Sequence, residues 1–249
     1  MSRLTDEHYA HLLGQAAGLS DVTSEMFTAD DVGFLAIQRF DRVVSASGEV
    51  VLIHQEDAAQ TLGLDWCSPD AKFQDHHWLN NPARASAARV AQPLGADPCS
   101  GSLLRDLVHR MVFSVVLGDN DAHAKNFAVL HTNQGTAVAP PYDVVPNLFA
   151  RDMIGEGFRM AFAVNGSFDH RQVSVGTLIS EIGSWGLLTD TAARTVVQDA
   201  IVRCAEAVGQ VIPPGGISDG LVDKLSWTVD RLVAGEPIGV SPWQAGKIF

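Results

Sequence analysis

The feature that most constrains this fold is an apolar stripe that runs over residues 102–117 and stops at Gly118. The stripe consists of Leu103, Leu104, Leu107, Val108, Met111, Val112 and Val115. These positions follow the 3.6-residue period of an α-helix and cover more than one of its sides, which is typical of a helix at the centre of a core. The sequence therefore predicts a buried helix from Ser102 to Leu117, around which the rest of the chain packs.

A polar loop follows this helix directly and carries the strongest chemical signal in the chain. Asp121 precedes Asn126 by five positions, and Asp143 comes 17 residues after Asn126. Phosphoryl transfer needs a carboxylate that orients the attacking hydroxyl group and accepts its proton, and oxygen ligands for the Mg²⁺ ion on the ATP phosphates. Asp121 fits the role of the base, and Asn126 and Asp143 fit the role of metal ligands.

Other interpretations of the loop can be weighed from the same residues. A calcium loop that starts at Asp119 is excluded, because its sixth position is Ala124 rather than Gly and its twelfth is Leu130 rather than Glu. A structural turn rich in Asp and Asn remains an alternative for the loop taken alone. Lys125 is either a catalytic cation that neutralises charge on the transferred phosphoryl group or an ordinary solvated lysine. For His123 we expect a structural role.

Four ordered stretches over residues 37–143 resemble one known family. The run from Asp121 to Phe127, together with Tyr142-Asp143, is similar to the catalytic core of HipA-type serine/threonine kinases, the toxin kinases of toxin–antitoxin pairs. The stretches Ile37 to Arg42 and Gln55 to Leu64 also resemble that family, and a weaker similarity extends through Met160 to Gly166. The resemblance implies an ATP- and Mg²⁺-dependent kinase in the cytoplasm, with a protein substrate and a DNA-binding antitoxin as partner.

The expected fold class is α+β and mostly helical: a protein-kinase-like large lobe with hinge strands and a truncated small lobe. Residues 1–54 are expected to form the remnant of the small lobe and the hinge, and residues 55–249 the helical large lobe with the catalytic loop. The predicted strands are Asp21 to Phe27, Gly33 to Val43, Glu49 to His54, Phe127 to His131 and Thr136 to Ala139. Predicted helices are Leu4 to Leu19 behind Thr5 as N-cap, Asp57 to Leu62, and three C-terminal helices capped by Ser174, by Asp190 or Thr191, and by Ser218.

The predicted hinge carries the expected nucleotide contact. In a kinase-like fold, the side-chain amide of Gln38 or a backbone group near Phe40 would meet the edge of the adenine ring. The alternative for Phe40 is an ordinary core aromatic.

Composition narrows the classes of partner. With 17 basic and 29 acidic residues the net charge is −12, so the chain is not expected to hold nucleic acid by its own field. No segment approaches the ~20 apolar residues of a membrane span, and no membrane association is expected. Three widely spaced cysteines indicate reduced thiols. Neither of the histidine pairs His8/His11 and His76/His77 has carboxylate or cysteine company at ligand spacing, so no zinc site is expected.

One part of a kinase is not recognisable in this sequence. Residues 1–33 contain no lysine and only the glycines Gly14, Gly18 and Gly33, so they cannot form a glycine-rich phosphate loop with a strand lysine. We therefore expect a kinase core that is incomplete or inactive alone: a truncated protein, a split kinase whose small lobe is another chain, or a regulatory relic. The alternatives are a small-molecule or lipid kinase with a related loop, and a catalytically defective binding subunit.

Overall fold

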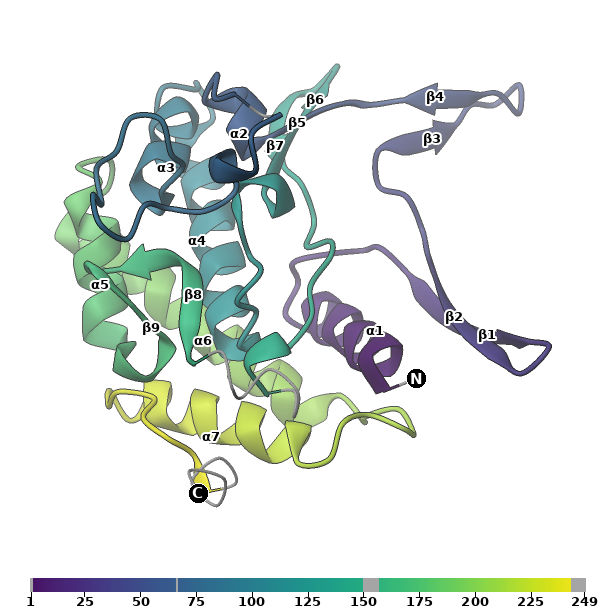
Figure 1. The fold of residues 1–249 in the computed structure, drawn as a ribbon. Helices are drawn as coiled ribbons and strands as arrows, with labels where there is room; N and C mark the ends of the chain where they lie inside the picture. The colour runs from purple at the N-terminus through teal and green to yellow at the C-terminus, as the bar shows by residue number, and fades with distance from the viewer. Residues whose placement is uncertain (1, 66, 150–156, 243–249) are drawn as a thin grey trace.

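The computed structural model describes residues 2–65, 67–149 and 157–242 (Figure 1). A helical body is built around helix α4, Ser100–Leu117, which packs against α3, α6 and α7. The other helices are α1 Ser2–Ala16, α2 Ala58–Thr61, α3 Ala87–Gly95, α5 Val175–Ser184, α6 Asp190–Gln210 and α7 Leu221–Val233. Short 3₁₀ turns cover Pro69–Ala71, Ala124–Asn126, Asn147–Phe149 and His170–Gln172. The expected α+β, mostly helical fold class is confirmed. Within the described residues, no helix combines the length and the apolar character that crossing a membrane requires.

Helix α4 is the central helix that the apolar stripe predicted, and it begins two residues earlier than expected. All of its residues from Leu107 to Leu117 are buried. The helix ends at Gly118, whose φ of 63° is the left-handed conformation that glycine adopts without strain. A Cβ atom at Gly118 would lie 2.8 Å from the ring of Phe149. Backbone conformation and close packing therefore both require glycine at the point where the chain enters the polar loop.

A three-stranded antiparallel sheet in the order β5-β6-β7 carries the chain away from that loop. Its strands are β5 His54–Asp57, β6 Ala128–Thr132 and β7 Gly135–Val138. The β6–β7 hairpin is the one predicted around Asn133 and Gln134. At the other end of β5, Asp57 caps helix α2 by accepting a hydrogen bond from the backbone N–H of Gln60. The sheet thus joins the entrance of the helical body to the strand that follows the polar loop.

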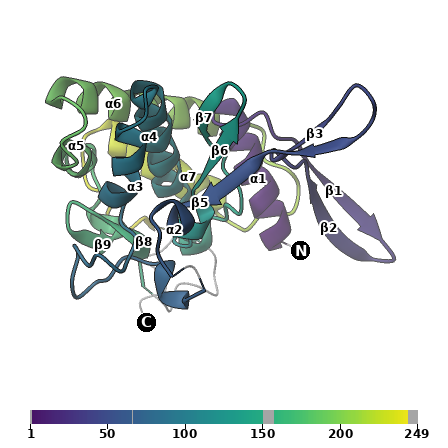
Figure 2. The ribbon, with the colours of Figure 1, turned by 90° about the horizontal axis from the view of Figure 1, so that it is seen from above.

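Two hairpins extend from the body on the side of α1 (Figure 2). They consist of β1 Ser24–Ala29 with β2 Val32–Ile37, and β3 Arg42–Val44 with β4 Val50–Leu52. The predicted single strand from Gly33 to Val43 is wrong, because the chain leaves the first hairpin after Ile37 and starts the second at Arg42. The predicted strand from Glu49 to His54 is likewise divided, between β4 and β5. In each case the strand ends where its pairing partner ends.

The C-terminal half adds the hairpin of β8 Arg159–Val164 and β9 Ser167–Asp169, followed by α5, α6 and α7. Ser174 caps α5 as predicted, in a reciprocal capping box with Thr177. Thr189 rather than Asp190 or Thr191 caps α6.

Two further predicted caps are also wrong. The N-cap position of α7 is Gly220, while the backbone N–H of Ser218 donates to Asp6 Oδ1 at 2.7 Å and ties this turn to α1. Thr5 lies inside α1 and does not cap it. At Ser218, a tertiary contact with α1 took precedence over the local capping preference.

Candidate active site

The polar loop after α4 is held by its own backbone and side chains. The backbone N–H of Asp121 donates to Asp119 Oδ1 at 3.1 Å, and that of His123 donates to Asp121 O at 2.7 Å. The side-chain amide Nδ2 of the buried Asn126 donates to the same Asp121 carbonyl oxygen at 2.8 Å. Asp121 and Asn126, five positions apart in sequence, are therefore brought into direct contact, and the half-buried Asp121 side chain remains accessible.

Arg110 connects this loop to the segment that carries Asp143. Its Nη2 atom donates to the carbonyl oxygens of Asn126 at 2.9 Å and of Tyr142 at 3.4 Å. Its guanidinium group also lies 5.2 Å from the ring centre of Phe127. Burial lowers the pKa of Arg110 to about 10, so the side chain still carries its charge at neutral pH. One buried cation thus fixes the relative position of two segments that are separated in sequence.

Tyr142 and Phe40 extend the same arrangement toward the predicted hinge. The hydroxyl group of Tyr142 donates to Lys125 O at 2.8 Å, and its ring lies 5.5 Å from that of Phe40. Asp143 is exposed and adopts a φ of 53°, a left-handed conformation that is uncommon outside glycine. Gln38 is exposed, and its side-chain oxygen accepts a hydrogen bond from Thr23 at 3.0 Å. Phe40 therefore packs against Tyr142, the residue that precedes Asp143, whereas the Gln38 side chain contacts Thr23, the residue before β1.

A buried acid, Asp119, lies behind the loop. Burial raises its pKa to about 8, partly opposed by the positive charge of Arg110, while the negative charges of Asp121 and Asp143 raise it further. Asp119 Oδ2 and Arg110 Nη1 have no hydrogen-bond partner among the described residues. Asp121 and Asp143 are therefore both near enough to Asp119 for their charges to affect its pKa.

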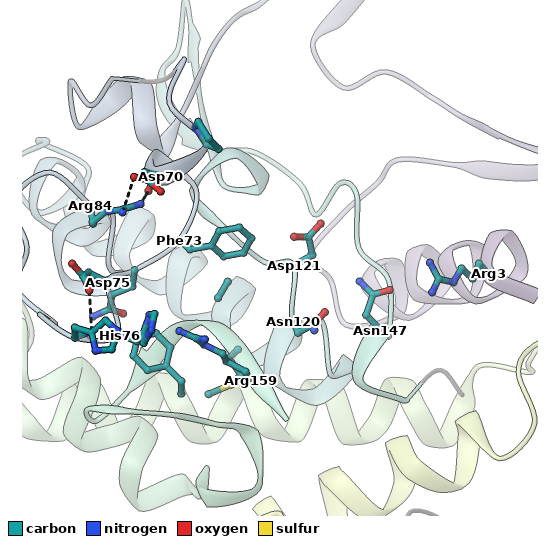
Figure 3. Close-up of a pocket in the computed structure, with 16 residues that line it drawn as sticks. Arg3, Asp70, Phe73, Asp75, His76, Arg84, Asn120, Asp121, Asn147 and Arg159 are labelled. Carbon is teal, nitrogen blue, oxygen red and sulfur yellow. Dashed lines mark hydrogen bonds and ion pairs between the residues drawn. The ribbon is translucent and has the colours of Figure 1, made fainter. Parts of the chain in front are cut away.

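An open cavity of about 840 Å³ adjoins Asp121 (Figure 3). Phe73 and Asn147 flank Asp121 in this view, and the ion pair between Arg84 and Asp70 lies farther along the wall. His123 supports this wall from behind. Its Nε2 lies 3.7 Å from Asp121 Oδ1, and its ring meets Phe73 edge-on at 5.3 Å. Of the predicted site residues, Asp121 lines this cavity, whereas Asn126 and Asp143 do not.

The donor set fits a magnesium ion with ATP. Because Asn126 Nδ2 is used by Asp121 O, its amide oxygen is the atom left to bind a cation. Asp143 adds an exposed carboxylate. An amide oxygen, a carboxylate and phosphate oxygens form the hard-oxygen environment that Mg²⁺ prefers. Lys125 is half-buried within the same turn, Ala124–Asn126.

Sequence reasoning did not identify Arg110 or the buried position of Asp119 as parts of this site. A signal for Arg110 was present, since it is a permanent charge within the apolar stripe, three residues after Leu107. Charges in such positions are rare unless they have a specific partner. The partners themselves, the carbonyl oxygens of Asn126 and Tyr142, could not be read from spacing.

Comparisons with known proteins find relatives that are described as kinases. The chain is 32% identical over 148 residues to "Putative kinase Y4mE" of Sinorhizobium fredii, covering 59% of this chain and 33% of that protein. It is 23% identical over 191 residues to the serine/threonine-protein kinase toxin HipA of Shewanella oneidensis, covering 72% of this chain and 40% of the toxin. The chain thus spans between a third and two fifths of the length of these two curated relatives.

Solved structures place the fold among kinases. HipA of Shewanella oneidensis, in a complex with HipB and operator DNA, superimposes with a TM-score of 0.73 at 20% identity, over 93% of this chain and 55% of that chain. The Helicobacter pylori proinflammatory kinase CtkA gives a TM-score of 0.57 at 12% identity, over 100% of this chain and 86% of that one. The family model for the HipA-like C-terminal domain matches residues 1–211. The chain therefore belongs to the HipA-like C-terminal domain family, as the motifs of its polar loop predicted.

Proposed function

We propose that this chain is the catalytic portion of an ATP- and Mg²⁺-dependent serine/threonine protein kinase of a toxin–antitoxin system. The observation that carries the proposal is the contact of Asn126 with Asp121, together with the Arg110 bridge from this loop to the Asp143 segment. These hydrogen bonds, of which the one from Arg110 to Asn126 is buried, tie the loop that carries Asp121 and Asn126 to the residue before Asp143. Such preorganisation is what phosphoryl transfer demands, because catalysis there is mostly positioning and electrostatics.

Each predicted residue has a distinct role in this proposal. Asp121 orients the acceptor hydroxyl group and takes its proton, while Asn126 and Asp143 hold the metal. The bound Mg²⁺ would supply the charge that neutralises the phosphate oxygens. Lys125 neutralises charge that develops on the transferred group.

The nucleotide base would lie against the segment Gln38–Phe40. In this proposal, residues 1–54 are the hinge and the remaining part of the small lobe, and residues 55–249 are the large lobe. Phe40 supports this placement, since it packs on Tyr142 beside Asp143.

The acceptor would enter through the cavity beside Asp121. This cavity has room for a peptide segment, and Asp121 lines it while the proposed metal ligands do not. Acceptor and nucleotide would therefore approach the loop from different sides, as in-line transfer requires.

The small-lobe phosphate contacts would come from residues outside this sequence. Residues 1–33 hold no lysine, so we propose that a preceding part of the same protein or a separate chain supplies the phosphate loop and its cation. A DNA-binding antitoxin is the proposed partner, because the Shewanella HipA structure contains HipB and operator DNA. The proposed location is the cytoplasm, which suits the free thiols of Cys67, Cys99 and Cys204.

Radiolabelled ATP assays with a candidate protein substrate test the proposal. Residues 1–249 alone should bind Mg-ATP weakly and transfer phosphate very slowly, and addition of the small lobe should restore transfer. Asp121→Asn should abolish the restored activity. Asp106→Asn is the matched control, since Asp106 is an exposed carboxylate on α4 paired with Arg105.

Other outcomes identify the alternatives. Transfer only to small molecules or lipids would indicate the second kinase class. Absence of both Mg-ATP binding and transfer, with the small lobe present, would refute the kinase and leave a non-catalytic binding subunit. Unchanged activity of Asp121→Asn would show that another group is the base.

A further inference from the structure

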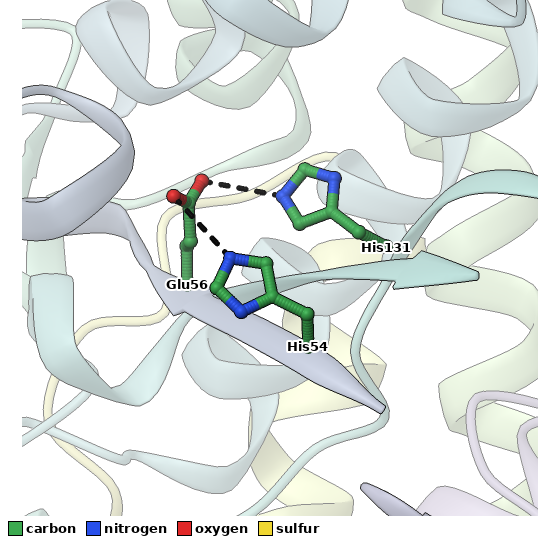
Figure 4. Close-up of side chains that lie close together, drawn as sticks. All are labelled: His54, Glu56 and His131. Atoms are coloured by element: carbon green, nitrogen blue, oxygen red, sulfur yellow. Dashed lines mark hydrogen bonds and ion pairs between the residues drawn. The ribbon is translucent and has the colours of Figure 1, made fainter. Parts of the chain in front are cut away.

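Two histidines and a glutamate, none of them among the proposed active-site residues, meet on one face of the β5–β6 ladder (Figure 4). His54 on β5 is directly opposite His131 on β6 in the antiparallel register. Glu56 follows His54 by two positions and therefore points to the same face. All three side chains are at least partly exposed, so an ion from solvent can reach them.

The distances within this cluster match those between ligands of one small ion. His131 Nε2 lies 3.2 Å from Glu56 Oε2, and His54 Nε2 lies 3.6 Å from Glu56 Oε1. The two imidazole rings are stacked with centres 5.3 Å apart, and one ligand atom from each residue lies within 4.8 Å of the others. A tetrahedral Zn²⁺ ion with bonds of ~2.0–2.1 Å separates its ligand atoms by about 3.3 Å. Each imidazole nitrogen already lies near this distance from one of the two Glu56 oxygens, and small side-chain rotations on an exposed face can bring the three ligands around one ion.

The chemistry of the three side chains selects the ion. Two imidazoles with one carboxylate suit zinc and its neighbours among the transition metals, whereas Mg²⁺ and Ca²⁺ prefer oxygen ligands. The backbone ladder between β5 and β6 fixes His54 and His131 before any ion arrives, so little conformational entropy is lost on binding. The net charge of −12 also favours cations near this surface.

We propose that His54, Glu56 and His131 bind one Zn²⁺ ion that clamps β5 to β6. The clamp would join the strand that enters the helical body to the strand that leaves the polar loop, since Phe127 directly precedes β6. The three residues leave at least one coordination position for water or for a ligand from a partner. Glu56 and His131 are 75 positions apart, which is why their spacing in sequence did not reveal the site. None of the three residues takes part in the proposed kinase reaction.

Zinc titration calorimetry on the chelator-treated chain tests the site, with ZnCl₂ alone as the probe. The wild-type chain should bind one equivalent of zinc, and His54→Ala/His131→Ala should bind that equivalent roughly hundredfold or more weakly. Zinc should also raise the melting temperature of the wild type and not that of the double variant. Glu56→Gln is a milder second variant, which keeps the shape of the side chain and should also weaken binding.

His76→Ala/His77→Ala is the matched control, because these neighbouring rings lie 4.0 Å apart outside the cluster. Its zinc binding should equal that of the wild type. A Co²⁺-loaded sample should show no thiolate-to-metal charge-transfer band, which separates this site from the exposed thiols of Cys67 and Cys99. Equal zinc affinity of the wild type and both cluster variants would overturn the proposal. So would a wild type that binds zinc only at the proposed Mg²⁺ site.

Discussion

Removal of the Arg110 charge should loosen the site before it unfolds the protein. Arg110→Met keeps the length and apolar stem of the side chain but removes the donors to Asn126 O and Tyr142 O. A hydrogen bond from a charged group contributes about 1.5–3 kcal/mol, and the 3.4 Å bond to Tyr142 counts for less than the 2.9 Å bond to Asn126. Relief of the buried charge offsets part of this loss. We expect a loss of ~2–4 kcal/mol in the free energy of unfolding.

Arg105→Met is the matched control on the same helix. Arg105 is exposed and pairs only with its neighbour Asp106 among the contacts described, so the same substitution there should change stability by less than ~0.5 kcal/mol. Urea unfolding gives the stabilities, and Mg-ATP binding to the folded variants gives the functional effect. Arg110→Met should weaken nucleotide binding more than Arg105→Met does. If the two variants were equal in stability and in nucleotide binding, the Arg110 bridge would not hold the site together.

Two further predictions concern the body that carries the loop. Leu107→Ala should reduce stability by ~2–5 kcal/mol in thermal melts, since the Leu107 side chain is 2% exposed. Leu52→Ala is the control and should have a small effect, because Leu52 is 69% exposed. Equal shifts in melting temperature would contradict the packing of α4. Asp119 has a pKa of about 8 in the folded chain against an ordinary value of 3.8, so the folded state binds the extra proton and loses stability as pH rises from about 4 to 8. Urea unfolding at about pH 5 and pH 9 gives the free energies of unfolding of the wild type and of Asp119→Asn. The wild-type value minus the variant value should fall as pH rises, and a constant or rising difference would refute the raised pKa of Asp119.

The central helix and its loop could be predicted from sequence because their signals are local. The apolar period of α4 and the left-handed stop at Gly118 are properties of neighbouring residues. The hydrogen bond between Asn126 and Asp121 also spans only five positions. Such short-range features follow from backbone geometry and residue type, so a pattern of letters is enough to place them.

The long-range parts of the site could not be predicted in the same way. Arg110 reaches Tyr142 across 32 positions, and its importance depends on which carbonyl groups the fold leaves without a strand or helix partner. The raised pKa of Asp119 has the same origin, because it depends on burial by elements distant in sequence. A motif predicts a chemistry for this site, but only the tertiary arrangement shows how the residues of the motif are supported.

The hairpins before β5 show why strand prediction failed where loop prediction succeeded. Their alternating and β-branched residues favour extended backbone, yet strand ends depend on the partner strand, which the pattern does not contain. Because each hairpin is a two-stranded ribbon, pairing stops at Ile37 and resumes at Arg42. Arg39 and Phe40 therefore lie outside both ladders. The backbone at an adenine hinge must likewise face the nucleotide rather than a neighbouring strand, so the break that contradicted the strand prediction supports the proposed role of this segment.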